Sequence, residues 1–259
     1  MRSLRLMTAL LLAGGLIAGP ALAAPPPAKE IYNRPANQVT KENSSVADAQ
    51  ALLQKSTAVV RTMETDPNVV NLMKKAKGVF IMPDFGRAAF IVGGKWGTGV
   101  LMSNDNGHWS APAFFSMGGG TLGLQAGVSG GPVALLIMNQ KVMDQFKGGA
   151  NWSLNAEGGF NIVNYSAETS QASWGKGDVI VWTNLRGAFA GIQASLTDIT
   201  FDSDFNKAIY GSKNIHQILA DQVTTPKLAM NLRKVMPPGG PTGAVPARHA
   251  AMRTKTPAG

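Results

Sequence analysis

The stretch "GGGTLGLQAGVSGGPVALLIMN", residues 118–139, decides between two fold classes for the chain. It carries no charged residue, and its glycines recur every four positions from Gly119 to Gly131, which is the spacing of small-residue interfaces in membrane helices. Within residues 122–129, however, apolar side chains alternate with glycine or polar ones, which is the period of a β-strand. Pro132 would interrupt a long helix. The stretch therefore predicts strands of a sheet in preference to a membrane span.

Short apolar segments separated by glycine continue on both sides of this stretch. The turn signal Asn104-Asp105-Asn106-Gly107 predicts a hairpin between two of them. Many short segments at this spacing are typical of a glycine-rich, mainly antiparallel sheet, either open, in a sandwich or in a partly closed barrel. The segments expected as strands are 78–83, 87–94, 97–102, 111–117, 121–129, 132–139, 152–158, 178–183 and 187–198.

Helices are expected before the sheet. Ser45 followed by Asp48 is a capping signal, and apolar residues then recur at helical spacing up to residue 63. Asp66 and Pro67 are typical of the start of a second helix, which Gly78 is expected to end.

Further helices are expected inside and after the sheet. One short helix at 139–148 interrupts the strands, and three follow them, beginning at Asp202 or Ser203, at Asn214 and at Thr225-Pro226. The predicted fold class is α+β, with helices at both ends of a mainly antiparallel sheet.

The first residues are expected to be a secretory signal peptide, residues 1–23. Arg2 and Arg5 precede a short apolar run, and "ALA" at 21–23 is a small-residue cleavage motif, so cleavage is expected after Ala23 or Ala24. Residues 237–259 are rich in proline, glycine and alanine, and residues 24–43 begin with a proline-rich run, which predicts a disordered basic tail and a disordered leader around a domain at 44–236. The expected location is periplasmic or secreted.

Charge and cysteine content narrow the possible partners. The formal net charge is +9, and it is +7 without Arg2 and Arg5. Such an excess favours anionic partners, and the chain has no cysteine for a disulfide or for lipid attachment. The mature protein is therefore expected to rely on its core for stability and to bind anionic groups.

One motif raises the possibility of a serine hydrolase. "GVSGG" at 127–131 matches the nucleophile pattern G-x-S-x-G around Ser129, and Asp178, Asp198 and His216 follow in the order of a serine, acid and histidine triad. That motif needs a helix directly after the serine, whereas Gly131 and Pro132 lead here into an apolar strand. A hydrolase is therefore the least favoured function.

Metal and cofactor sites are not predicted. None of the three histidines has metal-binding spacing, and the acidic pattern at 202–206 lacks the glycine and glutamate of a calcium loop, because Lys207 and Lys213 stand there. No glycine-rich loop with a following lysine that would hold a phosphate is present. We therefore do not expect the chain to be an enzyme or to need a cofactor.

Cations near strand ends are the positive candidates. Lys74, Lys75 and Lys77 precede the first strand, and as the end of a helix they also suit the helix dipole. Two strands begin with the similar sequences "RAAF" and "RGAF", and if those ends meet they form a basic rim for a phosphate. Solvated cations that discourage sheet aggregation are an equally good interpretation. The candidate headgroup ligands are Lys74, Lys75, Lys77, Arg87, Lys95 and Arg186.

Several ordered motifs resemble one family. "AKGVFIMP" at 76–83, the glycine-rich stretch, "NWSLNAEG" at 151–158, "LRGAFAGI" at 185–192 and "FNKAIYG" at 205–211 occur in the order seen in SYLF domains. The likeness covers residues 45–235, nearly all of the expected domain. It departs at 185–187, where Leu-Arg-Gly replaces the commoner Ser-Lys-Gly and keeps the cation.

The resemblance implies a non-enzymatic domain that binds anionic lipid, in some eukaryotic members together with actin. Export makes actin an implausible partner, so the expected partners are anionic phospholipids or a membrane surface of a bacterial envelope. Nucleic acid is not expected. The alternative is an interaction module that docks an envelope protein through the basic tail.

Overall fold

The computed structural model describes residues 36–86, 95–118, 130–154, 159–165, 176–185, 192–193, 196–211 and 214–238. The chain divides into two units, Met1–Val39 and Thr40–Gly259, and the fold described below is that of the second.

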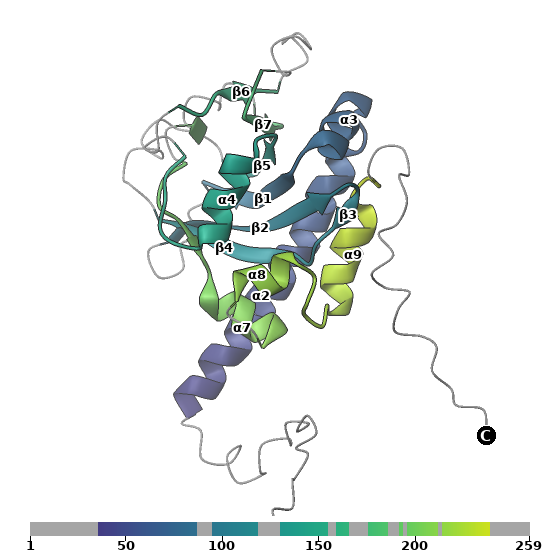
Figure 1. Ribbon diagram of the computed structural model, residues 1–259. Coiled ribbons are helices and arrows are strands. Elements are labelled where there is room, and N and C mark those ends of the chain that lie inside the picture. Colours follow the sequence, from purple (N-terminus) through teal and green to yellow (C-terminus); the bar gives the residue numbers. More distant parts are fainter. Residues whose placement is uncertain are drawn as a thin grey trace, which may run out of the picture. The chain divides into compact units, whose positions relative to one another are not determined.

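Eight strands form one sheet that is open in the described part of the chain, in the order β6-β7-β5-β1-β2-β4-β8, with β3 paired to β2 (Figure 1). All pairs are antiparallel except β6 with β7. This confirms the α+β class and selects the open sheet among the predicted arrangements. The strands are β1 (Gly78–Phe85), β2 (Lys95–Asp105), β3 (His108–Trp109), β4 (Ala113–Gly118), β5 (Gly131–Ile137), β6 (Ile162–Asn164), β7 (Val179–Thr183) and β8 (Ile199–Phe201).

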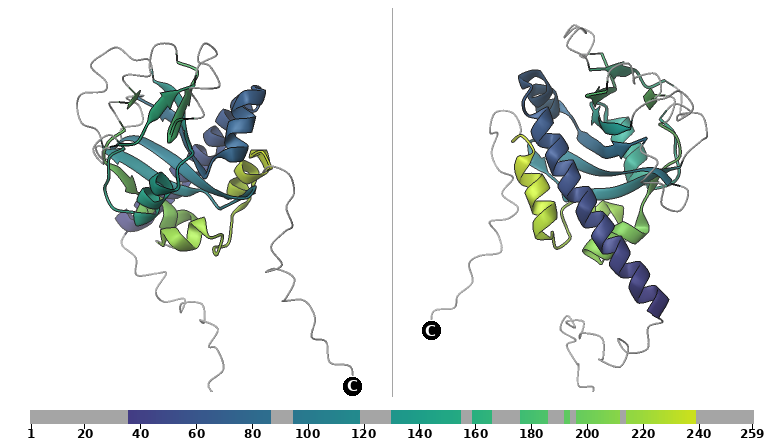
Figure 2. Two further views of the ribbon diagram at one scale, coloured as in Figure 1. Left: turned by 45° about the horizontal axis from the view of Figure 1, so that its top comes forward. Right: turned by 180° about the vertical axis from the view of Figure 1, so that it is seen from behind.

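Helices cover both faces of this sheet. The view from behind in Figure 2 shows the long helix α2 beside α9, and Figure 1 shows α4 and α8 on the opposite face. The helices are α2 (Ala36–Met63), α3 (Pro67–Lys75), α4 (Gln140–Gly148), α7 (Ser203–Tyr210), α8 (Ile215–Leu219) and α9 (Lys227–Val235).

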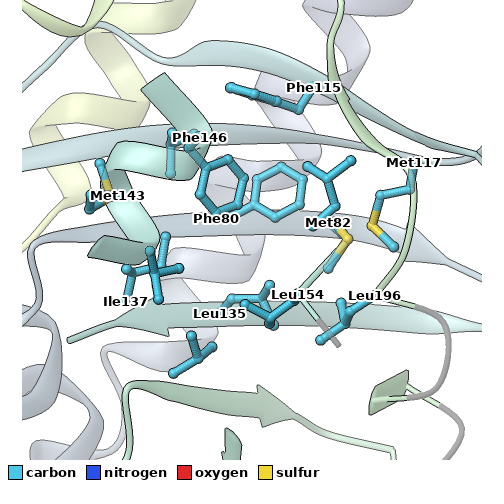
Figure 3. Packing of buried hydrophobic residues seen from close by; sticks show 14 of the residues in the cluster. Phe80, Met82, Phe115, Met117, Leu135, Ile137, Met143, Phe146, Leu154 and Leu196 are labelled. Atoms are coloured by element: carbon cyan, nitrogen blue, oxygen red, sulfur yellow. The ribbon is translucent and has the colours of Figure 1, made fainter. Parts of the chain in front are cut away.

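The central strand β1 shows why both faces need cover. Phe80 points into a cluster with Phe115 and Phe146 of α4, which Figure 3 shows, whereas Ile81 belongs to the second cluster with α2, α3 and α9. Nearly every residue of β1 is buried. Strands that are apolar on both sides must lie between two covering layers, which an open sheet between helices provides.

The hairpin turn was predicted correctly. Asn106 and Gly107 have φ angles of 50° and 94°, and Asp105 pairs with His108 across the turn. Positive φ at both central residues is the geometry that Asn-Gly favours in two-residue hairpins.

Several predictions of helices and strands differ from the structure. α2 begins at Ala36 rather than Ser45, so the leader expected at 24–43 contributes its last residues to a helix. Of the expected strand 152–158, the structure describes residues 152–154, where Trp152 forms an isolated bridge with Ile199 in place of a longer strand. Ile192 and Gln193 are helical instead of extended. The short strands β6 and β8 were not predicted. The expected strands 87–94 and 121–129 lie outside the described residues.

Candidate functional site

The lysines 74, 75 and 77 lie where α3 ends and β1 begins. Lys74 and Lys75 form the last turn of α3, as predicted, where cations suit the partial negative charge of the helix end, whereas Lys77 lies beyond the helix, directly before β1. The helix ends at Lys75 without a left-handed glycine. Gly78 instead begins β1, where a Cβ atom would lie 2.9 Å from the carbonyl oxygen of Met102. This glycine therefore allows close strand packing and does not end the helix.

Asn104 of β2 fixes the end of α3 to the sheet. Its side-chain amide donates to the carbonyl oxygens of Ala76 at 3.0 Å and Lys74 at 3.4 Å, and its side-chain oxygen accepts from the Gly107 amide at 2.7 Å. The Asn104 amide also donates to the carbonyl of Lys77 at 2.9 Å. One hairpin residue thus satisfies helix carbonyls that would otherwise lack partners. The backbone that carries the lysines is held on a rigid element.

The lysine side chains face solvent. Lys75 and Lys77 are exposed and Lys74 is half-buried. Among the described residues, none of the three forms an ion pair. The three ammonium groups can therefore meet an external anion without first breaking an internal contact.

The other end of α3 is held by Asp66. Its carboxylate accepts from the Asn68 amide at 2.9 Å and so caps the helix, as predicted. The same carboxylate accepts from the Tyr165 hydroxyl at 2.5 Å. Burial, together with the hydrogen bond to Asp66 and the charge of that carboxylate, raises the pKa of Tyr165 to about 12. α3 is therefore anchored at both ends.

Replacing Tyr165 with phenylalanine is expected to lower the free energy of unfolding at pH 7 by about 1–3 kcal/mol, the usual loss for a hydrogen bond to a charged group. The raised pKa gives a second signature. A tyrosine whose folded pKa exceeds its unfolded value of 10 stabilises the protein fully below pH 10 and loses this contribution as pH rises towards 12.

Urea unfolding of the wild type and Tyr165→Phe between pH 8 and 12 measures both effects. The decline above pH 10 should be shallower in the variant. Tyr210, whose pKa is also raised, mainly by burial, retains its share of the decline in both proteins. Parallel pH curves for the two proteins would contradict the role given to Tyr165.

The remaining candidate cations are not all close to these lysines. Lys95 begins β2 and pairs with Gly118, whereas the lysines adjoin the other end of β2, where Ser103 pairs with Gly78. Eight residues of strand separate Lys95 from Ser103, which is about 26 Å. Arg87 and Arg186 lie outside the described residues, as does the expected meeting of their strands. A single rim that includes Lys95 and the three lysines is therefore excluded.

A hollow lies elsewhere, at the edge formed by β8. It has a volume of about 360 Å³. Its wall includes three carboxylates, of which Asp202 also caps α7 by accepting from the Phe205 amide at 3.1 Å. Carboxylates repel phosphate, so this hollow is no headgroup site. The lining residues are Ser116, Asn151, Asp198, Thr200, Phe201, Asp202, Ser203 and Asp204.

Asp178 and Asp198, the two acids considered for a serine hydrolase, form hydrogen bonds that connect loops. The Asp178 carboxylate accepts from the Asn139 side chain at 2.5 Å and from the Asn161 amide at 2.8 Å. These bonds join the end of β5 to the start of β6. Asp198 accepts from the Asn151 side chain at 3.3 Å. Ser129 lies outside the described residues.

Two further observations limit what the site can do. In the described part of the chain, no group of three or more histidines or acids is placed to hold a metal ion. No helix among the described residues is long and apolar enough to cross a membrane.

Comparisons with known proteins identify relatives of the chain. Residues 118–237 match the family Ysc84, described as "Las17-binding protein actin regulator". The chain is 26% identical over 175 residues to Protein YSC84 of Saccharomyces cerevisiae and 25% identical over 174 residues to SH3 domain-containing protein PJ696.02 of Schizosaccharomyces pombe. It is also 26% identical over 176 residues to LAS seventeen-binding protein 3 of S. cerevisiae.

These matches cover 64% of this chain, but only 36–40% of the relatives. The chain thus spans about two fifths of the length of the curated relatives that it matches.

Proposed function

We propose that the chain is a non-enzymatic protein that binds anionic phospholipid surfaces in a bacterial envelope, because residues 118–237 match the Ysc84 family, the one that the SYLF resemblance indicated. The family description and the name of one relative, LAS seventeen-binding protein 3, denote binding proteins. They support binding in general, and the choice of lipid as the partner rests on the charge and geometry of this chain.

The observation that carries the proposal is the group of three lysines at the end of α3. Their backbone is fixed by Asn104, and their ammonium groups form no ion pair among the described residues. A lysine ammonium is a compact point charge that suits single phosphates at a membrane surface. The expected signal peptide would bring the chain to a compartment where the available anions are phospholipid headgroups and actin is absent.

Replacing Lys74, Lys75 and Lys77 together with alanine is expected to weaken binding to phosphatidylglycerol vesicles about 100-fold, because each lysine near an anionic surface contributes about 1 kcal/mol. Co-sedimentation of the full chain with phosphatidylglycerol vesicles and with neutral phosphatidylcholine vesicles measures this. Binding of the wild type should also weaken as salt rises from 50 to 500 mM, since salt screens exposed charges.

A matched control removes the same charge elsewhere. Lys141, Lys147 and Lys207 lie on α4 and α7, and their joint replacement with alanine is expected to change binding much less. Equal binding of the wild type to neutral and anionic vesicles would refute the proposal, and so would equal losses in the two triple variants. Single alanine variants of Arg87, Lys95 and Arg186 test a second contact region in the same assay.

A second candidate function is protein binding, which the family description and the name of LAS seventeen-binding protein 3 favour. In this case the basic tail at 237–259 would dock an acidic envelope protein. Affinity capture with the full chain and with a chain that ends at residue 238, which keeps Pro237, separates the two functions. Loss of a captured envelope protein on truncation, with vesicle binding unchanged, would favour the protein partner.

A further inference from the structure

The hairpin formed by β2 and β3 holds the ends of two helices. Asn104 and Trp109 are direct partners across the hairpin. The Asn104 side chain binds the Ala76 carbonyl at the end of α3, and the Trp109 indole donates to the Pro237 carbonyl, just after α9, at 2.8 Å. One cross-strand pair thus places the carboxyl ends of α3 and α9 on either side of the same hairpin.

Figures 1 and 2 agree with this arrangement. In each view α3 and α9 lie on the same side of the sheet, and Figure 1 shows β3 beside α9. Both helices contribute to the same hydrophobic cluster, through Met73 of α3 and Leu232 of α9. Both helices are therefore held by the same buried cluster as well as by the hairpin.

The last turn of α9 carries two cations, Arg233 and Lys234, and the structure pairs only Arg233 with a described acid. The Arg233 guanidinium donates to the Asp221 carboxylate, which also lies 3.4 Å from Nε2 of His108. Lys234 is exposed and forms no ion pair among the described residues. Arg233 is therefore held by an internal acid, whereas Lys234 is available to an external anion.

The charged residues at the hairpin and at the adjoining ends of α3 and α9 form a region that we call the hairpin surface. Its net charge is +3, because it has five cations and two carboxylates and His108 is counted as neutral. The cations are Lys74, Lys75, Lys77, Arg233 and Lys234, and the carboxylates are Asp105 and Asp221.

We propose that the hairpin surface is the membrane-contact face, and that Lys234 is a headgroup contact on the side of α9. The inference rests on the proposed function and specifies which face meets the lipid. Several exposed ammonium groups on separate elements suit a plane of many singly charged phosphates, because each charge can meet its own headgroup. The hairpin tip, at Asp105 and Asn106, then lies beside the headgroups, where the net positive charge of the hairpin surface outweighs the single carboxylate of Asp105.

A charge test compares the two ends of α9. Lys234→Ala is expected to weaken binding of the full chain to phosphatidylglycerol vesicles about fivefold, the effect of one lysine near an anionic surface. Lys227→Ala removes the same charge from an exposed position at the start of the helix, about 10 Å further along its axis. It should have little effect, and Lys234→Arg should restore binding. Equal losses in the two alanine variants would overturn the inference.

A label tests the orientation directly. The chain has no cysteine, so Asp105→Cys places a single environment-sensitive fluorophore at the hairpin tip. Asp144→Cys is the matched control, since Asp144 is an exposed acid on α4, which covers the other face of the sheet. The label at 105 should shift to shorter wavelength with phosphatidylglycerol vesicles and stay unchanged with phosphatidylcholine vesicles. The label at 144 should respond to neither.

The outcomes separate this inference from the proposed function. If the wild type co-sediments with anionic vesicles but the label at 105 does not respond, the proposed function stands and the hairpin surface is the wrong face. If the wild type binds no anionic vesicle, the proposed function itself fails. A response at 105 to soluble polyglutamate but not to vesicles would assign the surface to an acidic protein and overturn the lipid assignment.

Discussion

Phe80→Ala is expected to lower the free energy of unfolding by about 4 kcal/mol, the middle of the range for a large aromatic side chain lost from a core. Phe80 is fully buried in the central strand. Its ring centroid lies 6.0 Å from that of Phe115 and 5.3 Å from that of Phe146 (Figure 3). Gly99 of the neighbouring strand leaves space for the ring, since a Cβ there would lie 2.6 Å from a ring carbon. The site is thus shaped around this ring and cannot easily close over a cavity.

Urea unfolding followed by circular dichroism measures the change. Phe80→Leu is the matched control, because it keeps most of the volume and should cost less than about 1.5 kcal/mol. A loss below about 1 kcal/mol in Phe80→Ala would show that the surrounding residues collapse into the space and would contradict the tight packing described above.

Asn206→Leu is expected to cost about 3 kcal/mol, because it removes three buried hydrogen bonds. The Asn206 side chain accepts from the Phe114 amide at 3.0 Å. It donates to the carbonyls of Phe114 at 2.8 Å and Asp202 at 2.7 Å. Strand β8 pairs with β4 only from Phe115 onward, so this side chain takes the place of a strand partner for Phe114. After the change, the buried Phe114 amide has lost its acceptor.

Asn231→Leu is the control for this prediction, since Asn231 is an exposed asparagine on α9 and its loss should cost less than about 0.5 kcal/mol. Amide hydrogen exchange adds a local measurement. The Phe114 amide should exchange much faster in Asn206→Leu than in the wild type. Unchanged protection at Phe114 would contradict the partner role of Asn206.

The central strands were predicted because their signal is local. The apolar runs that form β1, β5 and β7 are continuous and bounded by glycine or polar residues. Such runs also indicate a strand buried on both faces, although only the structure shows that helices supply both layers. β6 and β8 were missed because each has three residues and depends on a distant partner. Phe201 of β8, for example, pairs with Phe115, 86 positions earlier.

The candidate site, like the fold, was predicted only where its signal is local in the sequence. The lysines before β1 and the turn at 104–107 are visible as short patterns. The roles of Asn104 and Trp109 were not predictable, because their partners are backbone carbonyls 28 and 128 positions away. Lys234 was missed for the same reason, since only the fold brings the end of α9 to the hairpin.

The pairing of β4 with β8 also has a consequence for how the chain folds. Phe115 and Phe201 are 86 positions apart, whereas Phe80 and Leu101 of the β1–β2 pair are 21 apart. Closing the longer loop costs about 1 kcal/mol more conformational entropy. Contacts between distant residues slow folding, because this entropy is lost before the contacts are gained. The sheet is therefore expected to assemble from its centre outward, with β8 joining last.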